Sequence, residues 1–378
     1  MEFEIRLARP EDLPALGIFM RQAYGAQTVF QSPDFLKWFL GRGPLANSVF
    51  HLEAQVAVTS DGRVVGHYGG LNYKLWLNGR LVSLVWGVNA YTLPEYRGFG
   101  IGKQLVDATA ARFDVFGVIG FTTETAHFYD EIGFNIFKFQ RFTRYIRNLS
   151  EETYAICRLI GQDDALLRRS LSASTSVPVV SNMPLGVHQI AVDNWQSFTW
   201  NLPQPAFTTT QRDVAHLKWR FFSQTAMCYA VIGVETDGRI TGYAVVRKET
   251  VEPTVHQSAR IVDLYGESAG MDSLLQGVVA FAQNCECAYV DFSCFGLHYR
   301  TSLLEAGFSE LTDNNCALLP QIGSTEFRPN IEHIGLFSSE YGAEISALRS
   351  KDVYFTRADS DRDRVARLDQ FLPIGRLS

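Results

Sequence analysis

The 378-residue sequence lacks a long apolar run, a signal peptide and a surplus of positive charge. No stretch reaches the roughly 18 uncharged apolar residues that a membrane span requires. Residues 1–6, Met-Glu-Phe-Glu-Ile-Arg, lack the basic and apolar regions of a signal peptide. The formal net charge of −6 leaves no general basic face for nucleic acid or for an anionic membrane. We therefore expect a cytoplasmic protein that binds neither, with a local basic pocket for any small anionic ligand.

Cysteine is also scarce, with six residues in the whole chain. This density does not indicate a disulfide scaffold, so we predict reduced thiols. Cys285, Cys287, Cys294 and His298 form the one grouping that suggests a metal. Because the first two cysteines lead into a strand-like run, they lie on one face of a buried strand and not on a knuckle turn. We predict no metal site.

Glycine marks the most informative segment, Arg97-Gly98-Phe99-Gly100-Ile101-Gly102. It follows an apolar run and opens a helical pattern, so backbone N–H groups can close on an anion at the positive end of a helix. The dinucleotide fingerprint requires glycine at position 103 or 105, where Lys103 and Leu105 stand. The nucleoside triphosphate loop requires glycine at position 97 and Ser or Thr at position 104, which is Gln104. Both motifs are excluded, and R-x-x-G-x-G remains.

That loop resembles the acyl-coenzyme A binding loop of the GCN5-related N-acetyltransferase (GNAT) superfamily, and two other segments share the resemblance. Pro94-Glu95-Tyr96-Arg97 leads into the loop as in those proteins. Phe128-Tyr129-Asp130-Glu131-Ile132-Gly133-Phe134 matches their F-Y-x-x-x-G-F segment. The resemblance implies an α/β fold with a mixed sheet, and acyl-CoA as the cosubstrate.

The order of predicted elements indicates two GNAT-like domains in tandem, the second degenerate. A strand hairpin with the turn Asp61-Gly62-Arg63 in the first half returns with the turn Asp237-Gly238-Arg239 in the second. The second loop, residues 266–271, lacks the glycine spacing and carries Glu267, so we expect it not to bind the cofactor. The predicted domains are an acyl-CoA-binding domain at 1–147, a polar linker at 148–183, and an acceptor-binding domain with a C-terminal tail at 184–378.

The loop and the strand before it supply the predicted cofactor contacts. Backbone N–H groups from Gly98 to Lys103 hold the pyrophosphate. The strand at 88–92 hydrogen-bonds the pantetheine arm as an added strand does. The predicted cofactor-binding residues are Asn89, Ala90, Tyr91, Thr92, Arg97, Gly98, Phe99, Gly100, Ile101, Gly102, Lys103 and Phe128.

Tyr129 matches the family tyrosine that protonates the leaving thiolate. A phenol suits this role because it stays protonated at neutral pH, while a thiol has a pKa of about 8.5. The alternative is a tyrosine that only fills the core. The backbone N–H near Ala90 or Tyr91 is the natural oxyanion donor.

The general base is less clear from the sequence. Glu124, His67 and His127 all lie near the expected cleft. Histidine has many structural uses, so the sequence does not decide among them. We take Glu124 with Tyr129 as the predicted catalytic pair.

Two segments of the second half are predicted to bind the acceptor. Residues 207–221 combine aromatic rings with cations, which suits a stacked base or sugar beside phosphates, although an amphipathic helix is the alternative. Residues 353–364 begin as a strand and continue as alternating acids and arginines, for which a solvated surface is the alternative. The predicted substrate residues are His216, Trp219, Arg220, Tyr354, Arg357, Asp359 and Asp361.

The D-x-D-R-D-R tail resembles one found in tandem GNAT proteins of bacterial polysaccharide gene clusters. Within that group the chain is similar to sugar N-acyltransferases that acylate a dTDP-linked 3-amino-3,6-dideoxyhexose. The resemblance implies transfer of an acetyl or 3-hydroxybutanoyl group to that dTDP-aminosugar for a surface polysaccharide such as the lipopolysaccharide O-antigen. A peptide or other small amine acceptor, and a noncatalytic acyl-CoA sensor, remain as alternatives. An exposed sheet edge would allow a homodimer.

Overall fold

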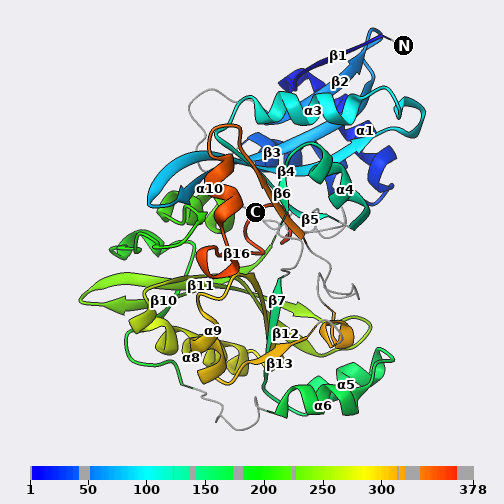
Figure 1. The fold of residues 1–378 in the computed structure, drawn as a ribbon. Helices are drawn as coiled ribbons and strands as arrows, with labels where there is room; N and C mark the ends of the chain where they lie inside the picture. The colour runs from blue at the N-terminus through cyan, green and yellow to red at the C-terminus, as the bar shows by residue number, and fades with distance from the viewer. Residues whose placement is uncertain are drawn as a thin grey trace.

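The computed structural model describes residues 2–41, 52–121, 123–136, 142–172, 182–223, 227–312, 315–320 and 333–363. Within these residues the chain forms two eight-stranded mixed sheets, one in each half of the molecule (Figure 1). Helices pack against both sheets. None of the described helices is both long and apolar enough to cross a membrane.

The first sheet has the strand order β1-β2-β3-β4-β5-β15-β6. Its neighbours pair antiparallel except β4 and β5, which are parallel. The long β3–β4 hairpin turns at Asn78-Gly79, both with positive φ, as the sequence predicts. The strands are β1 (Phe3–Leu7), β2 (Ala54–Thr59), β3 (Val64–Leu77), β4 (Arg80–Thr92), β5 (Val115–Phe121), β15 (His333–Phe337) and β6 (Asn135–Ile136), with β9 (Thr209–Thr210) on β3.

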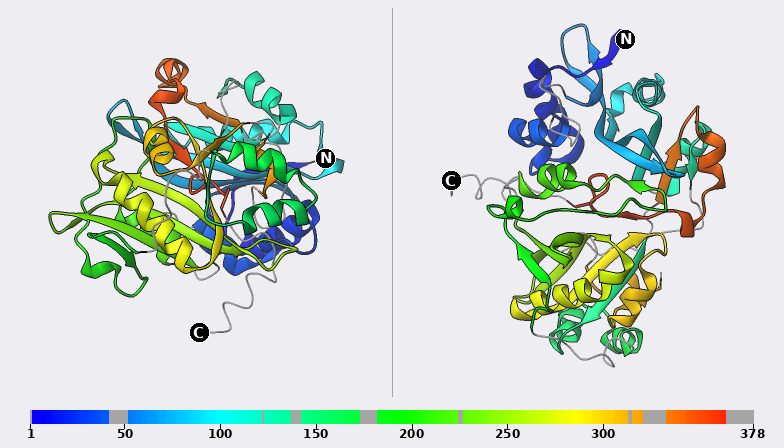
Figure 2. Two further views of the ribbon diagram at one scale, coloured as in Figure 1. Left: turned by 90° about the horizontal axis from the view of Figure 1, so that it is seen from below. Right: turned by 90° about the vertical axis from the view of Figure 1, so that its left-hand side faces the viewer.

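Helices cover opposite faces of this sheet. A side chain at Gly66 of β3 would meet Ile101 and Leu105 of α3, whereas one at Gly69 would meet Leu40 of α2. The right-hand view of Figure 2 shows the dark blue helices on one side of the first sheet and the cyan helix on the other. The four helices are α1 (Leu13–Tyr24), α2 (Pro33–Gly41), α3 (Ile101–Ala110) and α4 (Thr123–Glu131).

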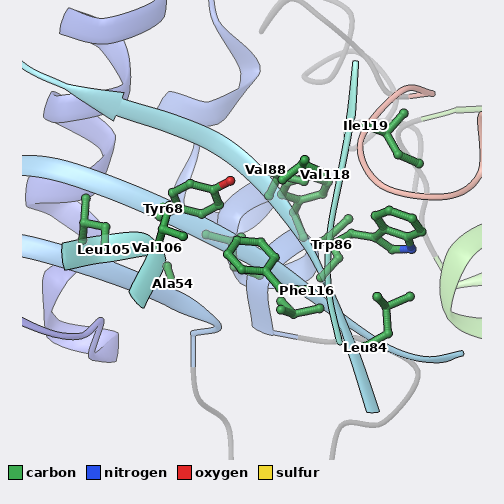
Figure 3. Packing of buried hydrophobic residues seen from close by; sticks show 14 of the residues in the cluster. Ala54, Tyr68, Leu84, Trp86, Val88, Leu105, Val106, Phe116, Val118 and Ile119 are labelled. Carbon is green, nitrogen blue, oxygen red and sulfur yellow. The ribbon is translucent and has the colours of Figure 1, made fainter. Parts of the chain in front are cut away.

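Large rings in the first sheet lie over glycines of the neighbouring strand. A Cβ at Gly87 of β4 would come within 2.5 Å of the Tyr68 ring, and one at Gly117 of β5 within 2.3 Å of the Trp86 ring. Figure 3 shows Tyr68, Trp86 and Phe116 among the buried side chains of this core. Both positions require glycine because it has no side chain, and a methyl group there would displace a packed ring.

The second sheet repeats the first, with the order β14-β7-β13-β12-β11-β10-β8. Its one parallel pair, β12–β13, stands where β4–β5 stands in the first sheet. The predicted tandem fold of mixed α/β domains is therefore confirmed. The elements are β8 (Val187–Ile190), β10 (Tyr229–Thr236), β11 (Arg239–Thr250), β12 (Gln257–Gly266), β13 (Cys287–Phe295), β7 (Thr143–Asn148), β14 (Ser309–Leu311), α8 (Ser268–Asn284) and α9 (Arg300–Glu305), with β16 (Phe355–Thr356) on β13.

The two halves exchange a strand. β7 follows the first half in sequence but lies between β13 and β14, and β15 from the second half lies between β5 and β6. Figure 1 shows β7 among the strands of the lower sheet. Two strands therefore cross the predicted boundaries of residues 1–147 and 184–378. Separating the halves would break backbone ladders in both sheets.

The segment predicted as a linker, 148–183, contains two packed helices in its described part. It contains α5 (Glu152–Leu159) and α6 (Asp164–Ser170), whose buried Tyr154, Ile156 and Leu167 pack in one cluster with residues of the second sheet. The Asp163 side chain caps α6 by accepting a hydrogen bond from the Leu166 N–H at 2.9 Å. Exposed charged residues such as Glu152, Arg158 and Arg168 lie on the outer faces of these two amphipathic helices.

Candidate active site

A cavity of 630 Å³ opens in the first half between the C-terminal end of β4, the start of α3 and α4. Tyr68 and Tyr129 lie in its wall together with residues of the glycine loop. Two of the predicted cofactor residues, Asn89 and Phe99, are not part of its lining. The others all line it: Ala90, Tyr91, Thr92, Arg97, Gly98, Gly100, Ile101, Gly102, Lys103 and Phe128.

The glycine loop has the backbone of an anion cradle. Gly98 and Gly100 have φ of 87° and 72°, a left-handed conformation that side chains disfavour, and Gly100 is the N-cap of α3. No other residue comes within 4 Å of a Cβ placed at Gly98 or Gly102. Backbone N–H groups at the start of the ten-residue helix α3 therefore have open space in front of them. This geometry fits the pyrophosphate of coenzyme A.

Two cations flank the cradle. The Arg97 guanidinium is exposed, donates a hydrogen bond to the Thr92 carbonyl at 3.2 Å and lies over the Tyr91 ring at 5.4 Å. Lys103 lies one turn before Asp107 on α3, with its Nζ 2.5 Å from that carboxylate. Both line the cavity and supply the local positive charge that an acidic chain needs for an anionic ligand.

Asn89 acts through its backbone. Its φ of 53° accompanies an irregularity in the β3–β4 register, opposite His67 to Gly69. In this conformation its carbonyl accepts a hydrogen bond from His67 Nδ1 at 2.9 Å. The irregularity interrupts the ladder beside Ala90 and Tyr91 and turns this end of β4 toward the cavity. The oxyanion role of their N–H groups stays a prediction.

The Tyr129 hydroxyl lies 2.5 Å from the Tyr68 hydroxyl. Tyr129 is 4% exposed and packs against the rings of Phe121 and Phe134. Burial raises the pKa of Tyr129 to about 12, and the hydrogen bond with Tyr68 opposes this shift. Tyr129 is therefore a protonated phenol in the cavity wall at neutral pH, as its predicted role as an acid requires.

The three candidates for a general base have different environments. The side chain of Glu124, on α4, lies outside the described residues. His127 is exposed, and its Nε2 lies 3.2 Å from the Glu131 carboxylate, away from the cavity lining. His67 lines the cavity but is fully buried, and burial lowers its pKa to about 4. Because a carbonyl only accepts, His67 Nδ1 carries the proton and the ring is neutral.

The predicted substrate residues lie in the interior between the halves. All seven are buried, from 0% exposure for Arg220, Tyr354 and Asp359 to 9% for Asp361, and none lines the cavity of the first half. The red segment that carries Tyr354 to Asp361 runs between the two sheets in the right-hand view of Figure 2. The alternative of a solvated charge run is therefore wrong for the described residues. The prediction of direct substrate contact stays untested.

Pairing explains how this charged tail is buried. Arg212 lies 3.0 Å from Asp263 and 2.6 Å from Asp359, so one guanidinium joins the second sheet to the tail. The pKa of Asp263 is lowered because Arg212 outweighs the effect of burial. Arg220 donates to the Asp363 carbonyl at 2.7 Å. Buried charges persist when each is paired and hydrogen-bonded, which composition alone does not reveal.

Tyr68 is one of the cavity residues that the sequence did not identify as part of the site, with Leu105 and Thr125. Its hydroxyl contacts a residue 61 positions away in the chain, so no local pattern predicts the pair. The described residues contain no group of three or more His, Cys, Asp and Glu side chains arranged to hold a metal ion. All six cysteines are free thiols, as predicted.

Residues 52–136 match the family model of the acetyltransferase (GNAT) domain. No curated protein sequence matches the chain. A protein of unknown function from Enterococcus faecalis V583, described as a probable N-acyltransferase, has 11% identity and a TM-score of 0.53, with 90% of this chain and 73% of that chain covered.

Two further solved structures share the fold. A GCN5-related N-acetyltransferase from Anabaena variabilis has 15% identity and a TM-score of 0.51, with 89% of this chain and 72% of that chain covered. An N-myristoyltransferase from Saccharomyces cerevisiae with bound myristoyl-CoA has 10% identity and a TM-score of 0.51, with 89% of this chain and 79% of that chain covered. Such low identities show the fold alone. Residues 52–136 therefore form a GNAT acetyltransferase domain with a cavity at its glycine loop, which supports an acyl-CoA-dependent N-acyltransferase activity.

Proposed function

We propose that the chain transfers an acetyl or 3-hydroxybutanoyl group from acyl-CoA to the amino group of a nucleotide-linked aminosugar, a dTDP-3-amino-3,6-dideoxyhexose. One observation carries the acyl-transfer part: a single cavity joins the glycine loop at one end to the Tyr129 hydroxyl at the other. An anion site and a proton donor in one cavity match the two ends of an acyl-CoA thioester.

The acceptor part rests on the sequence resemblance of the tail and on where the tail lies. A Cβ at Gly120, near the end of β5, would come within 2.6 Å of the Arg362 guanidinium. The next residue of β5, Phe121, packs on Tyr129 at a ring distance of 5.1 Å. The tail therefore reaches the neighbourhood of the proton donor. An acceptor that enters between the halves would meet it there.

Each step has a group of this chain assigned to it. Backbone N–H groups near Ala90 and Tyr91 stabilise negative charge on the thioester oxygen as the amine attacks. Tyr129 gives its proton to the sulfur as the carbon–sulfur bond breaks, and the proton released by the amine restores the phenol. Arg97 and Lys103 hold the anionic end of the donor. The amine must reach the site neutral, and Glu124 stays the predicted base.

A thiol-release assay with a panel of amines tests this proposal. We expect turnover with dTDP-aminosugars and little with peptides or simple amines. Tyr129→Phe should lower kcat by about 10²- to 10⁴-fold with little change in acyl-CoA affinity, because it removes only the transferable proton. Turnover with peptides alone would favour the peptide alternative. Tight acyl-CoA binding without turnover of any amine would favour the sensor.

A further inference from the structure

We propose that Tyr68 is a positioning residue for proton transfer, whose hydroxyl donates a hydrogen bond to Tyr129 and thereby aims the Tyr129 proton at the leaving sulfur. The proposal rests on the proposed role of Tyr129 as the acid. It adds a second tyrosine to the site, from a strand that the glycine loop and the F-Y-x-x-x-G-F segment do not include.

The two hydroxyl groups are placed for one hydrogen bond. Their oxygens are 2.5 Å apart, and both tyrosines line the cavity. A phenol has one proton to donate, so whichever hydroxyl donates within the pair has none left for the cavity. If Tyr68 donates, the Tyr129 proton is free to point toward a thioester. The opposite arrangement would leave Tyr129 without a proton to give.

The reaction itself requires Tyr68 as the donor. A phenolate oxygen can only accept, so once the Tyr129 proton has left, the hydrogen bond between the two oxygens must run from Tyr68 to Tyr129. A hydrogen bond from Tyr68 therefore stabilises the phenolate that forms on Tyr129 while its proton moves to sulfur. The amine proton then neutralises that phenolate, and Tyr68 ends the reaction unchanged.

The packing of the sheet holds Tyr68 in this place. Its ring crosses β4 at Gly87, where a Cβ would come within 2.5 Å of the ring and 2.8 Å of the hydroxyl oxygen. The ring also meets Phe116 of β5 edge-on, with centroids 5.4 Å apart and an interplanar angle of 80°. Tyr68 thus reaches from β3 across two strands toward α4. A ring held between a glycine and an aromatic edge has little rotational freedom, which suits a group that must aim another.

Tyr68→Phe tests the proposal because it keeps the ring and removes only the hydroxyl. We expect kcat for thiol release to fall about 10- to 100-fold, the effect of losing a hydrogen bond to a developing charge. The dissociation constant of acyl-CoA should change by less than about twofold, because the bond matters only during proton transfer. In a Tyr129→Phe background the same change should cause little further loss, because the proton that Tyr68 aims is already gone.

Tyr73→Phe is the matched control. Tyr73 lies on the same strand and is buried, and its hydroxyl has no hydrogen-bond partner among the described residues. Removal of the Tyr73 hydroxyl should leave kcat near the wild-type value.

Several results would overturn the inference: wild-type kcat in Tyr68→Phe, losses that multiply in the double variant, or acyl-CoA affinity that falls in step with kcat, as expected of a purely structural role. Each of these leaves the proposed function standing. A wild-type protein that releases no thiol with any amine would overturn both proposals.

Discussion

The two halves share one topology but differ where the helix between the two parallel strands begins, at α3 in the first half and α8 in the second. In the first half, Gly98 and Gly100 hold the loop open before α3. In the second half, Glu267 is the N-cap of α8, and the loop closes on itself. There the Tyr299 hydroxyl accepts a hydrogen bond from the Gly266 N–H at 3.0 Å and donates one to the Gly266 carbonyl at 2.9 Å.

The strands are also closely packed just before α8. A Cβ at Gly266 of β12 would come within 2.5 Å of the Cα of Gly242, its paired residue on β11. The second half lacks the glycine spacing, yet it still contains the helix α8 and the parallel pair β12–β13. The fold therefore does not require that spacing. The fold and its ligand site are separable.

The exchanged strands explain why the second half is needed although its loop is closed. It accepts β7 from the first half and returns β15 to the sheet that carries the cavity. β15 pairs with β5, directly beside the parallel partner of β4. The sheet that carries the cavity therefore includes a strand from the other half.

The largest contrast between the halves should appear in cofactor affinity. Gly100→Val introduces a branched side chain at a φ of 72°. The free loop would relax from this strained conformation, and binding would have to restore it at a cost of about 1–3 kcal/mol, or about a 5- to 150-fold weaker dissociation constant for acyl-CoA. Isothermal titration calorimetry measures this change.

Gly238→Val is the control in the second half. Gly238 has a φ of 74° in a hairpin turn, and no other residue lies within 4 Å of its Cβ position. This variant should lose stability to the same strain but bind acyl-CoA with unchanged affinity. Equal loss of affinity in both variants would contradict the distinction between the two halves.

The next contrast concerns the tyrosines Tyr129 and Tyr299, which stand near corresponding helices. Tyr299→Phe removes two buried hydrogen bonds to Gly266, so the free energy of unfolding should fall by about 1–3 kcal/mol while kcat stays unchanged. Tyr129→Phe removes the buried hydrogen bond with Tyr68, so its stability should also fall, but unlike Tyr299→Phe it should lower kcat. Chemical denaturation measures the free energy of unfolding of both variants, and steady-state kinetics measures their kcat. Lower kcat with full stability in Tyr299→Phe would mean that the second loop takes part in turnover.

The last contrast is a pH dependence of stability, to which the buried His67 and His216 both contribute. Burial lowers the pKa of His67 to about 4 and that of His216 to about 3, against about 6.5 in an unfolded chain. The unfolded state then binds protons that the folded state excludes. The stability that both rings contribute is complete above about pH 6.5. It falls by about 1.4 kcal/mol per pH unit for each histidine as the pH drops toward the folded pKa values.

His67→Gln should make this slope shallower by the share of one histidine. Urea unfolding at several values from about pH 7 to about pH 5 measures the slope. The comparison uses slopes because the variant also loses the hydrogen bond to Asn89, which changes stability at every pH. An unchanged slope would mean that His67 takes up its proton in the folded state at its ordinary pKa.

The cofactor side of the site could be predicted largely from local sequence. The residues from Arg97 to Gly102 needed only a strand before them and a helix after them to indicate an anion cradle, and the structure has both. The acceptor side was harder, because the predicted residues His216, Trp219 and Asp359 are interior. In the sequence, an aromatic residue beside a cation gives the same pattern whether the side chains contact a ligand or another part of the chain.

By itself the sequence determined the tandem α/β architecture and the position of the glycine loop. Both depend on short-range demands: turns that require positive φ, and residues that alternate along a strand. Only the tertiary structure decided which strand completes each sheet, that Tyr68 faces Tyr129, and that the charged tail is buried. These depend on which groups far apart in the chain meet, and a partner such as Arg212 for Asp359 is visible only after the halves have packed together.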